Sequence, residues 1–191
     1  MLDKNNEEIT EKMLNRASKF AWKSWTIRLN FDVRQAKSGE QPDFRVLIRT
    51  PENDERGEMD DNTIMYHYFP IMDVDHPLRG LCVINPNFYY TVNGEGVPMN
   101  LIDPENYSPG THVRGSTIDL DGVLRHEFGH GIGLSHDPEP GNTMSTPYMI
   151  LEDFLQPRDI MRGAAKYVKQ NMSESDLQRW LKWLKSRSED Y

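Results

Sequence analysis

The sequence predicts an α+β fold, in which the helices and the strands occupy separate stretches of the chain. Two observations lead to this prediction. Apolar residues recur at helical spacing near the N-terminus and again after residue 117. Between these stretches, short segments alternate apolar and polar residues or are continuously apolar, as strands with a buried face are. The 191 residues suffice for one domain with a core of its own.

The first predicted element is an amphipathic helix over residues 7–25, which packs on the sheet. A strand is predicted next, in WTIRLNFDVRQ at residues 25–35, because every second residue there is apolar. These apolar residues are Ile27, Leu29, Phe31 and Val33. Residues 37–43 contain Gly and Pro and form a turn, and FRVLIRT at residues 44–50 is a second strand.

Two further strands are predicted, TIMYHYFP at residues 63–70 and LCVINPN at residues 81–87. A polar loop over residues 51–62 precedes them, and a loop with Pro and Gly over residues 71–80 separates them. Residues 91–117 are rich in Asn, Pro, Gly and Ser and are expected to form a long ordered loop. Loops of this length inside a domain are usually either functional or disordered.

Three helices are predicted in the remaining chain, over residues 117–133, 156–171 and 173–187. The prediction for the whole chain is one domain over residues 1–172, followed by an amphipathic helical tail over residues 173–191. The tail presents an apolar face made by Leu177, Trp180, Leu181 and Leu184. The sequence favours packing of this face on its own domain, and docking on a partner or a membrane surface remains open.

Composition and charge restrict the class of partner. The net charge of −8 argues against nucleic acid or anionic lipid as the main partner, and no apolar run approaches the roughly 20 residues of a membrane span. Cys82 is the single cysteine, which excludes an intrachain disulfide. The first residues carry no apolar core of a signal peptide. The expected location is cytoplasmic or virion-associated, or extracellular if a leader has been removed.

Three of the six histidines fall within HEFGHGIGLSH, residues 126–136. His126 and His130 are four residues apart, so on a helix both rings can bind one zinc ion. Glu127 lies about 100° around the helix, where it can reach a water on the metal as a general base. Gly133 can end the helix with a positive φ, which lets His136 arrive as third ligand. Three histidines leave the fourth tetrahedral position open, as in catalytic zinc sites.

HEFGHGIGLSH matches the extended zinc signature HExxHxxGxxH of the metzincin metallopeptidases, and Met144 in GNTMSTPY fits their methionine turn. Within that group the chain resembles the matrixins most. The methionine follows the third histidine by eight residues, TIMYHYFP resembles the matrixin edge strand, and PRDIMRGAAKYVK resembles the closing helix. The resemblance covers roughly residues 8–170. Asp137 departs from it, because matrixins usually carry Ser or Thr there, and so does Pro147, which lies one residue later than expected.

The resemblance implies a metzincin-type zincin fold, with a twisted mixed β-sheet, an N-terminal helix, an active-site helix and C-terminal helices. It implies a zinc metalloendopeptidase in which Glu127 assists the attack of a zinc-bound water on a peptide bond. Met144 would be an apolar floor below the metal, and Tyr148 a wall of the S1′ substrate pocket. The substrate would pair along an edge strand that includes Thr63, Ile64, Met65, Tyr66 and His67.

The resemblance also raises the question of further metals, because matrixins usually carry a structural zinc and calcium ions. His67 coincides with one ligand of that structural zinc, but the neighbouring segments supply no matching histidines. We therefore expect one catalytic zinc ion, without a second structural zinc or calcium. Two other functions remain open, a zinc-binding structural component of a larger assembly such as a virion, and a hydrolase of cell-wall peptide crosslinks. The natural substrate, the host, the means of latency and the oligomeric state do not follow from the sequence.

Overall fold

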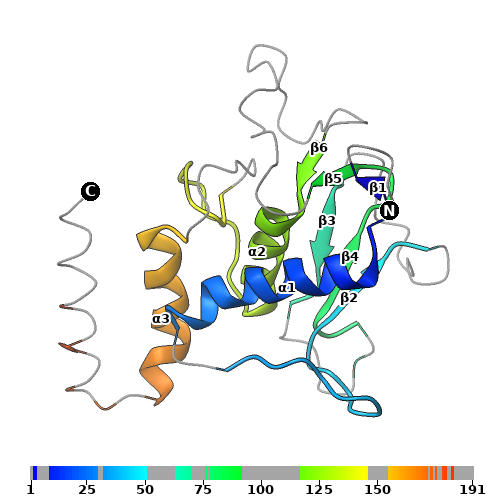
Figure 1. The fold of residues 1–191 in the computed structure, drawn as a ribbon. Coiled ribbons are helices and arrows are strands. Elements are labelled where there is room, and N and C mark those ends of the chain that lie inside the picture. The colour runs from blue at the N-terminus through cyan, green and yellow to red at the C-terminus, as the bar shows by residue number, and fades with distance from the viewer. Residues whose placement is uncertain are drawn as a thin grey trace.

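The computed structural model describes most of the residues that form helices and strands. The described residues are 2–3, 9–29, 32–50, 63–69, 76, 78–91, 117–145, 155–171, 173, 175, 178–179 and 182. In chain order the elements are β1 (Leu2–Asp3), α1 (Glu11–Thr26), β2 (Arg45–Ile48), β3 (Met65–His67), β4 (Leu81–Ile84), β5 (Tyr89–Thr91), β6 (Thr117–Asp119), α2 (Leu120–Gly131) and α3 (Pro157–Asn171). Figure 1 shows α1 running across α2, with the strands towards the N-terminal end of α1 and α3 beyond its C-terminal end. The predicted α+β class is confirmed.

The described strands form two sheets of three. In the first, in the order β2-β4-β3, β2 is parallel to β4 and β3 is antiparallel to it, so this sheet is mixed. In the second, in the order β1-β5-β6, all neighbours are parallel. β3 therefore lies at an edge, and within the described residues its outer side has no paired strand.

Helix α1 begins at a conventional N-cap, where the Thr10 hydroxyl accepts a hydrogen bond from the Met13 amide at 3.3 Å. The predicted helix over residues 7–25 is confirmed from Glu11 onward. Its buried face consists of Ala17, Ala21, Trp22 and Trp25. This face packs on α2, and the indole ring of Trp22 stacks on Phe128 with the ring centroids 4.4 Å apart.

The strand predicted over residues 25–35 is wrong. Trp25 and Thr26 still belong to α1, the chain turns at residues 27–29, and residues 32–35 form no strand. Alternation predicts a strand only where one face is buried, and here Ile27 and Val33 are exposed while Leu29 is buried. Leu29 packs instead below the C-terminal end of α1, where its amide donates to the Trp25 carbonyl at 2.8 Å.

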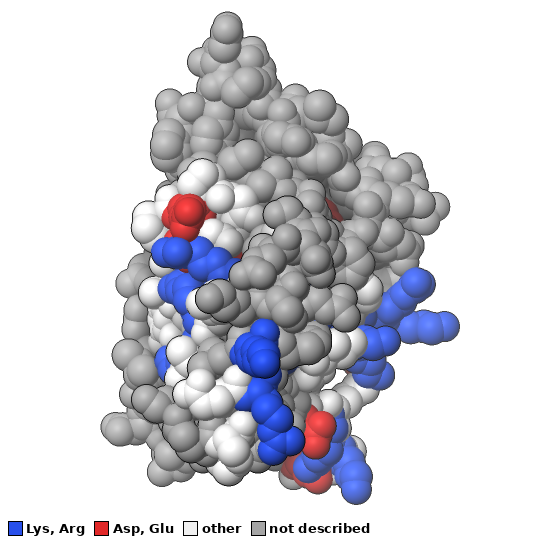
Figure 2. All heavy atoms as spheres, turned by 90° about the vertical axis from the view of Figure 1, so that its left-hand side faces the viewer, with Lys and Arg blue, Asp and Glu red and all other residues white. Residues whose placement is uncertain are grey.

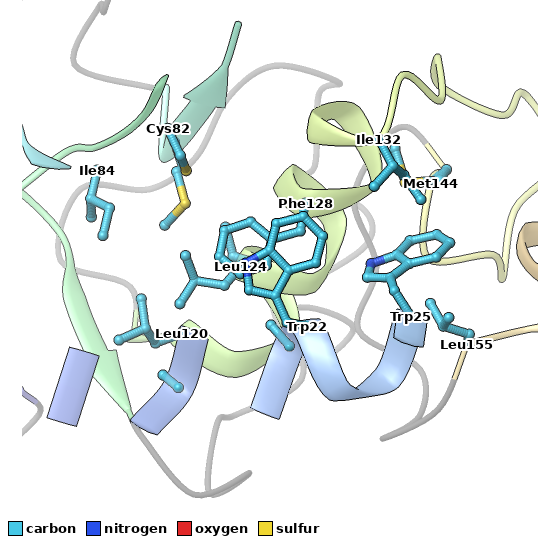
Figure 3. Close-up of a cluster of buried hydrophobic side chains, with 14 of the residues drawn as sticks. Trp22, Trp25, Cys82, Ile84, Leu120, Leu124, Phe128, Ile132, Met144 and Leu155 are labelled. Atoms are coloured by element: carbon cyan, nitrogen blue, oxygen red, sulfur yellow. The ribbon is translucent and has the colours of Figure 1, made fainter. Parts of the chain in front are cut away.

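Helix α2 is the centre of the domain, because each of its twelve residues is buried. Asp119 caps its N-terminus by accepting hydrogen bonds from the amides of Asp121 and Gly122, both at 3.2 Å. Trp25 of α1 donates from its indole nitrogen to the Arg125 carbonyl at 2.9 Å. Figure 3 shows the side chains of Trp22 and Trp25 standing between the two helices, with Met144 beyond Trp25. The two helices are thus joined by apolar packing and by a buried hydrogen bond.

The other predicted elements are largely confirmed. The strands predicted at residues 44–50, 63–70 and 81–87 appear as β2, β3 and β4, and the helix predicted at 156–171 appears as α3. The helix predicted over residues 117–133 begins at Leu120, since β6 occupies the first three positions. Strands β1 and β5 were not predicted. The loops at 51–62 and 92–116, and most of the tail, lie outside the described residues. None of the described helices has the length and apolar character needed to cross a bilayer.

Candidate metal centre

The turn at the end of α2 connects His130, the second histidine of the signature, to His136, the third. After the helix, Gly133 has a φ of 84°, a left-handed conformation that residues with a Cβ rarely adopt. The amides of Gly133 and Leu134 donate to the carbonyls of His130 and Gly129, at 2.7 and 2.9 Å. These bonds satisfy the last carbonyls of the helix and reverse the chain, so that His136 returns towards His130.

His126, His130 and His136 converge on one point. Their candidate ligand atoms all lie within 4.8 Å of one another, and the Nε2 atoms of His130 and His136 are 3.1 Å apart. Two ligands at the zinc–nitrogen distance of 2.0–2.1 Å and a tetrahedral angle are about 3.3 Å apart. The donor set and this spacing therefore fit a zinc ion. Within the described residues this is the one group of three or more potential metal ligands.

Hydrogen bonds to carbonyls orient two of the three rings. Nδ1 of His126 lies 2.6 Å from the Thr143 carbonyl oxygen, and Nδ1 of His130 lies 2.7 Å from that of Leu134. A carbonyl oxygen can only accept, so both Nδ1 atoms carry the proton. The Nε2 atom of each ring is then the unprotonated one, which is the form that binds a metal.

The surroundings also keep the histidines uncharged. Burial, and then the neighbouring His130, lower the pKa of His126 to about 3. Burial lowers the pKa of His130 to about 4. The pKa of His136 is lowered as well, by burial and then by the Arg162 guanidinium. Three rings that stay neutral at physiological pH are ready to bind a cation without first losing protons.

Glu127 is buried on α2 directly after the first histidine, and its Oε2 has no hydrogen-bond partner among the residues that the structure describes. Burial alone raises the pKa of Glu127 to about 8. A buried carboxyl group with a free oxygen is costly unless a ligand or cation completes its surroundings. The site thus holds a carboxyl group that is available for proton transfer.

Met144 is fully buried at the turn that follows the third histidine. Its Sδ lies so close to Gly129 that a Cβ there would be 2.2 Å from it. The buried carboxylate of Asp159, at the start of α3, accepts hydrogen bonds from the amides of Thr143 and Met144 at 2.7 and 3.2 Å. Asp159 therefore fixes the turn that also supplies the carbonyl for His126.

The predicted substrate strand lies beside the three histidines. Met65, Tyr66 and His67 form β3, and Thr63 and Ile64 lead into it. After the strand, the ring of Phe69 lies 5.3 Å from that of His130, centroid to centroid. The His67 ring packs against the end of α2, where a Cβ on Gly131 would lie 2.8 Å from its Nε2, and burial lowers its pKa to about 4. Tyr148, the predicted pocket wall, lies outside the described residues.

Several residues that hold the site were not assigned a role from the sequence. They are Trp25, Asp159, Arg158, Arg162 and Lys166. Asp137, which Arg158 and Arg162 contact, stands out in the sequence only as a departure from the matrixin pattern. Each of the five contacts a residue far away in sequence, so no local spacing could have revealed the contact.

The model of one protein family, the matrixins, matches residues 1–165. The match covers most of the chain, and the chain belongs to the matrixin family. A search of curated proteins found no match. The protein is therefore a metzincin metallopeptidase with a zincin fold, and the three-histidine group fits the zinc on which this family depends.

Proposed function

We propose that this matrixin is an endopeptidase whose zinc is held by Nε2 of His126, His130 and His136, with Glu127 as general base. The observation that carries the proposal is the convergence of three neutral imidazoles on one point. Two of them present an unprotonated Nε2 because their Nδ1 donates to a carbonyl. Zinc with three protein ligands supplies a Lewis acid that has an open position for water or a carbonyl oxygen.

Glu127 moves the proton in this proposal. Its free Oε2 accepts a proton from the attacking water, while the water oxygen forms a bond to the carbonyl carbon of the substrate. The bond between carbon and nitrogen then breaks, and Oε2 returns the proton to the leaving amine. The burial of Glu127 and of α2 keeps bulk water from competing for this proton.

The substrate is a polypeptide that binds in extended form along β3. The outer edge of β3 has no partner strand within the described residues, so its backbone can pair with an added strand. The segment from Thr63 to His67 supplies these backbone groups, and Tyr148 remains our candidate for the wall of the S1′ pocket. Digestion of a peptide library, with the cleaved bonds mapped by mass spectrometry, identifies the preferred side chains.

The decisive variant is Glu127→Ala, together with Glu127→Gln, which keeps the volume of the buried side chain. Both are expected to retain zinc, because all three imidazoles remain, and to lose at least about 10²-fold in kcat/KM for peptide cleavage. Zinc content is measured by elemental analysis and cleavage with a fluorogenic peptide. His130→Ala is the matched control, since it should lose the metal as well as the activity.

Activity above a few per cent in both Glu127 variants would contradict the assignment of the base. Zinc retained in His130→Ala at the level of the unmodified protein would contradict the ligand set.

We further propose that the chain binds one zinc ion and neither a structural zinc nor calcium. The proposal rests on the ligands, because His67 directs Nδ1 to the Tyr68 carbonyl at 2.9 Å and belongs to no group of three or more potential metal ligands within the described residues. Elemental analysis after exhaustive dialysis is expected to give one zinc per chain. Two tightly held zinc ions, or retained calcium, would show that other segments supply ligands.

A further inference from the structure

Helix α3 presents basic side chains to the segment that carries the third histidine. Arg158, Arg162 and Lys166 follow one another at intervals of four residues, so they lie on one face of the helix. All three bond to residues in the segment Gly133–Glu139. Figure 2 views the molecule from the side of α3, where the described charged side chains are mostly Lys and Arg. We call these three residues the basic clamp.

Arg162 makes the largest number of bonds in the basic clamp. Its Nη2 donates to the Ser135 carbonyl at 2.8 Å, to the Ser135 hydroxyl at 3.1 Å and to the His136 carbonyl at 3.5 Å. Its Nη1 donates to the Asp137 carboxylate at 3.3 Å. One planar guanidinium group thus bonds to His136 itself and to the residues on both sides of it.

Arg158 and Lys166 fix the two ends of the same segment. Arg158 donates from Nε to the Asp137 carboxylate at 2.6 Å and pairs through Nη1 with Glu139 at 3.0 Å. Lys166 donates to the Gly133 carbonyl at 2.7 Å. Asp137 is only 1% exposed, so its two arginine partners offset the cost of burying its charge.

The third histidine differs from the other two in what orients its ring. His126 and His130 each have a carbonyl at Nδ1, whereas within the described residues Nδ1 of His136 has no hydrogen-bond partner. His136 is also the exposed member of the group. Its position therefore depends on its backbone, and the basic clamp holds that backbone.

We propose that the basic clamp, with Arg162 at its centre, positions His136 and thereby sets the affinity of the site for zinc. The inference rests on the proposed ligand set. Groups that orient metal ligands from outside the coordination sphere typically change metal affinity by about 10- to 100-fold when they are removed. Here the orienting bonds reach the ligand through the main chain instead of through its ring.

The test measures the zinc dissociation constant of the full chain by competition with a chromophoric chelator. Arg162→Ala is expected to raise this constant by about 10- to 100-fold. Arg162→Lys keeps the charge but cannot bond to Ser135 and Asp137 in one plane, so it should recover only part of the affinity. Met161→Ala, a neighbouring change at a side chain that is 55% exposed, is the matched control and should bind zinc as the unmodified protein does.

A double-mutant cycle separates positioning from a general loss of stability. If Arg162 acts through His136, then Arg162→Ala should weaken zinc binding strongly in the unmodified chain and hardly at all in a His136→Ala background. A purely structural role for Arg162 would weaken binding equally in both backgrounds and would overturn the proposal. Cobalt substitution supplies a second signal, because a displaced third ligand changes the visible absorption of Co²⁺.

An unchanged zinc affinity in a folded Arg162→Ala variant would also overturn the proposal. If that variant does not fold, Lys166→Ala decides the matter, because it removes a single bond from an exposed side chain. Weaker zinc binding then supports the basic clamp, and unchanged binding refutes it. Since the readout is zinc affinity, a chain that binds zinc but cleaves no peptide would refute the proposed function and leave this inference standing.

Discussion

Gly129 is the residue at which α1, α2 and the methionine turn approach one another most closely. A Cβ at this position would lie 2.2 Å from Sδ of Met144 and 2.9 Å from Cζ2 of Trp25. The Trp25 indole cannot move aside without breaking its hydrogen bond to the Arg125 carbonyl, and a Cβ here would have to displace two completely buried side chains. Because Gly129 carries a hydrogen atom where alanine carries a methyl group, the two helices and the methionine turn can pack this closely.

We expect Gly129→Ala to lower the free energy of unfolding by about 1–2 kcal/mol. The cost of overpacking is typically about 1–3 kcal/mol, and it outweighs the gain of up to about 1 kcal/mol that alanine brings to a helix. Urea denaturation of the metal-free protein measures the difference.

Gly163→Ala on α3 is the control for that measurement. Its Cβ would lie 2.8 Å from Cδ1 of Leu29, the end of a side chain that can rotate. Its stability should therefore stay within about 1 kcal/mol of the unmodified protein. A Gly129→Ala protein as stable as the Gly163→Ala protein would show that the methionine turn is not closely packed.

At the scale of elements, the N-terminus of α2 combines a cap with a buried carboxyl group. Asp119 accepts two backbone hydrogen bonds, which favour its ionised form. Burial, and then the charge of Asp121, act in the opposite direction and raise the pKa of Asp119 to about 6. The folded state therefore favours the protonated form of Asp119 more than the unfolded state does.

We expect this carboxyl group to make the stability of the fold depend on pH. Its pKa is raised from the ordinary value of 3.8 to about 6 in the folded state. Between these two pH values the folded protein therefore keeps a proton on Asp119 that the unfolded chain has lost. The resulting stabilisation is fully present below pH about 4 and is lost as the pH rises through about 6, with a size on the order of 2–3 kcal/mol. The measurement is the unfolding free energy of the unmodified protein minus that of Asp119→Asn, with chelator present, between pH 4 and 7.

Because the asparagine does not titrate, this difference isolates Asp119 from the other acidic groups. It should fall steadily across the range. A difference that does not change with pH would mean that the carboxyl group has the same pKa in the folded and unfolded states.

The elements that could be predicted are those whose signal is local. Helices α1 and α3 are predicted by the spacing of their apolar residues. The convergence of the three histidines is predicted by their spacing, which suits a helix followed by a turn. β1, β5 and β6 are two or three residues long and show no clear alternation, whereas the equally short β3 lies within the longer run TIMYHYFP. The error at residues 25–35 has the opposite origin, because alternation is visible there but carries no information on whether a partner strand exists.

The support of the site could not be predicted, because it comes from pairings between distant residues. Trp25 contacts a residue 100 positions away, and Arg162 and Lys166 contact residues 27 and 33 positions away. Arginine, lysine and tryptophan on amphipathic helices have ordinary roles on the surface or in the core. These residues differ from others of their type only in the folded chain, where α1 packs on α2 and α3 packs on the segment that follows α2.

At the scale of the whole molecule, the zinc site and the fold should stabilise each other. Ligands from the helix and the loop converge only in the folded chain, so zinc binds the native state in preference to the unfolded one. Free zinc at about 1,000 times its dissociation constant adds about 4 kcal/mol to the free energy of unfolding. For a domain of this size, about 1 kcal/mol shifts Tm by roughly 2–4 °C.

Removal of zinc by a chelator is therefore expected to lower Tm by roughly 8–16 °C. Calorimetry or circular dichroism with and without added zinc measures the shift. His130→Ala should melt at the same temperature in both conditions. A zinc-dependent shift that persists in this variant would place the stabilising ion elsewhere in the molecule.

The position of α3 in the chain has a consequence for biosynthesis. Translation runs from the N-terminus, and His126, His130 and His136 leave the ribosome before Arg158, Arg162 and Lys166. A nascent chain that already displays all three imidazoles still lacks the helix that holds the segment of the third one. Under the proposed role of the basic clamp, tight capture of zinc thus waits until α3 has left the ribosome and packed against the segment of His136.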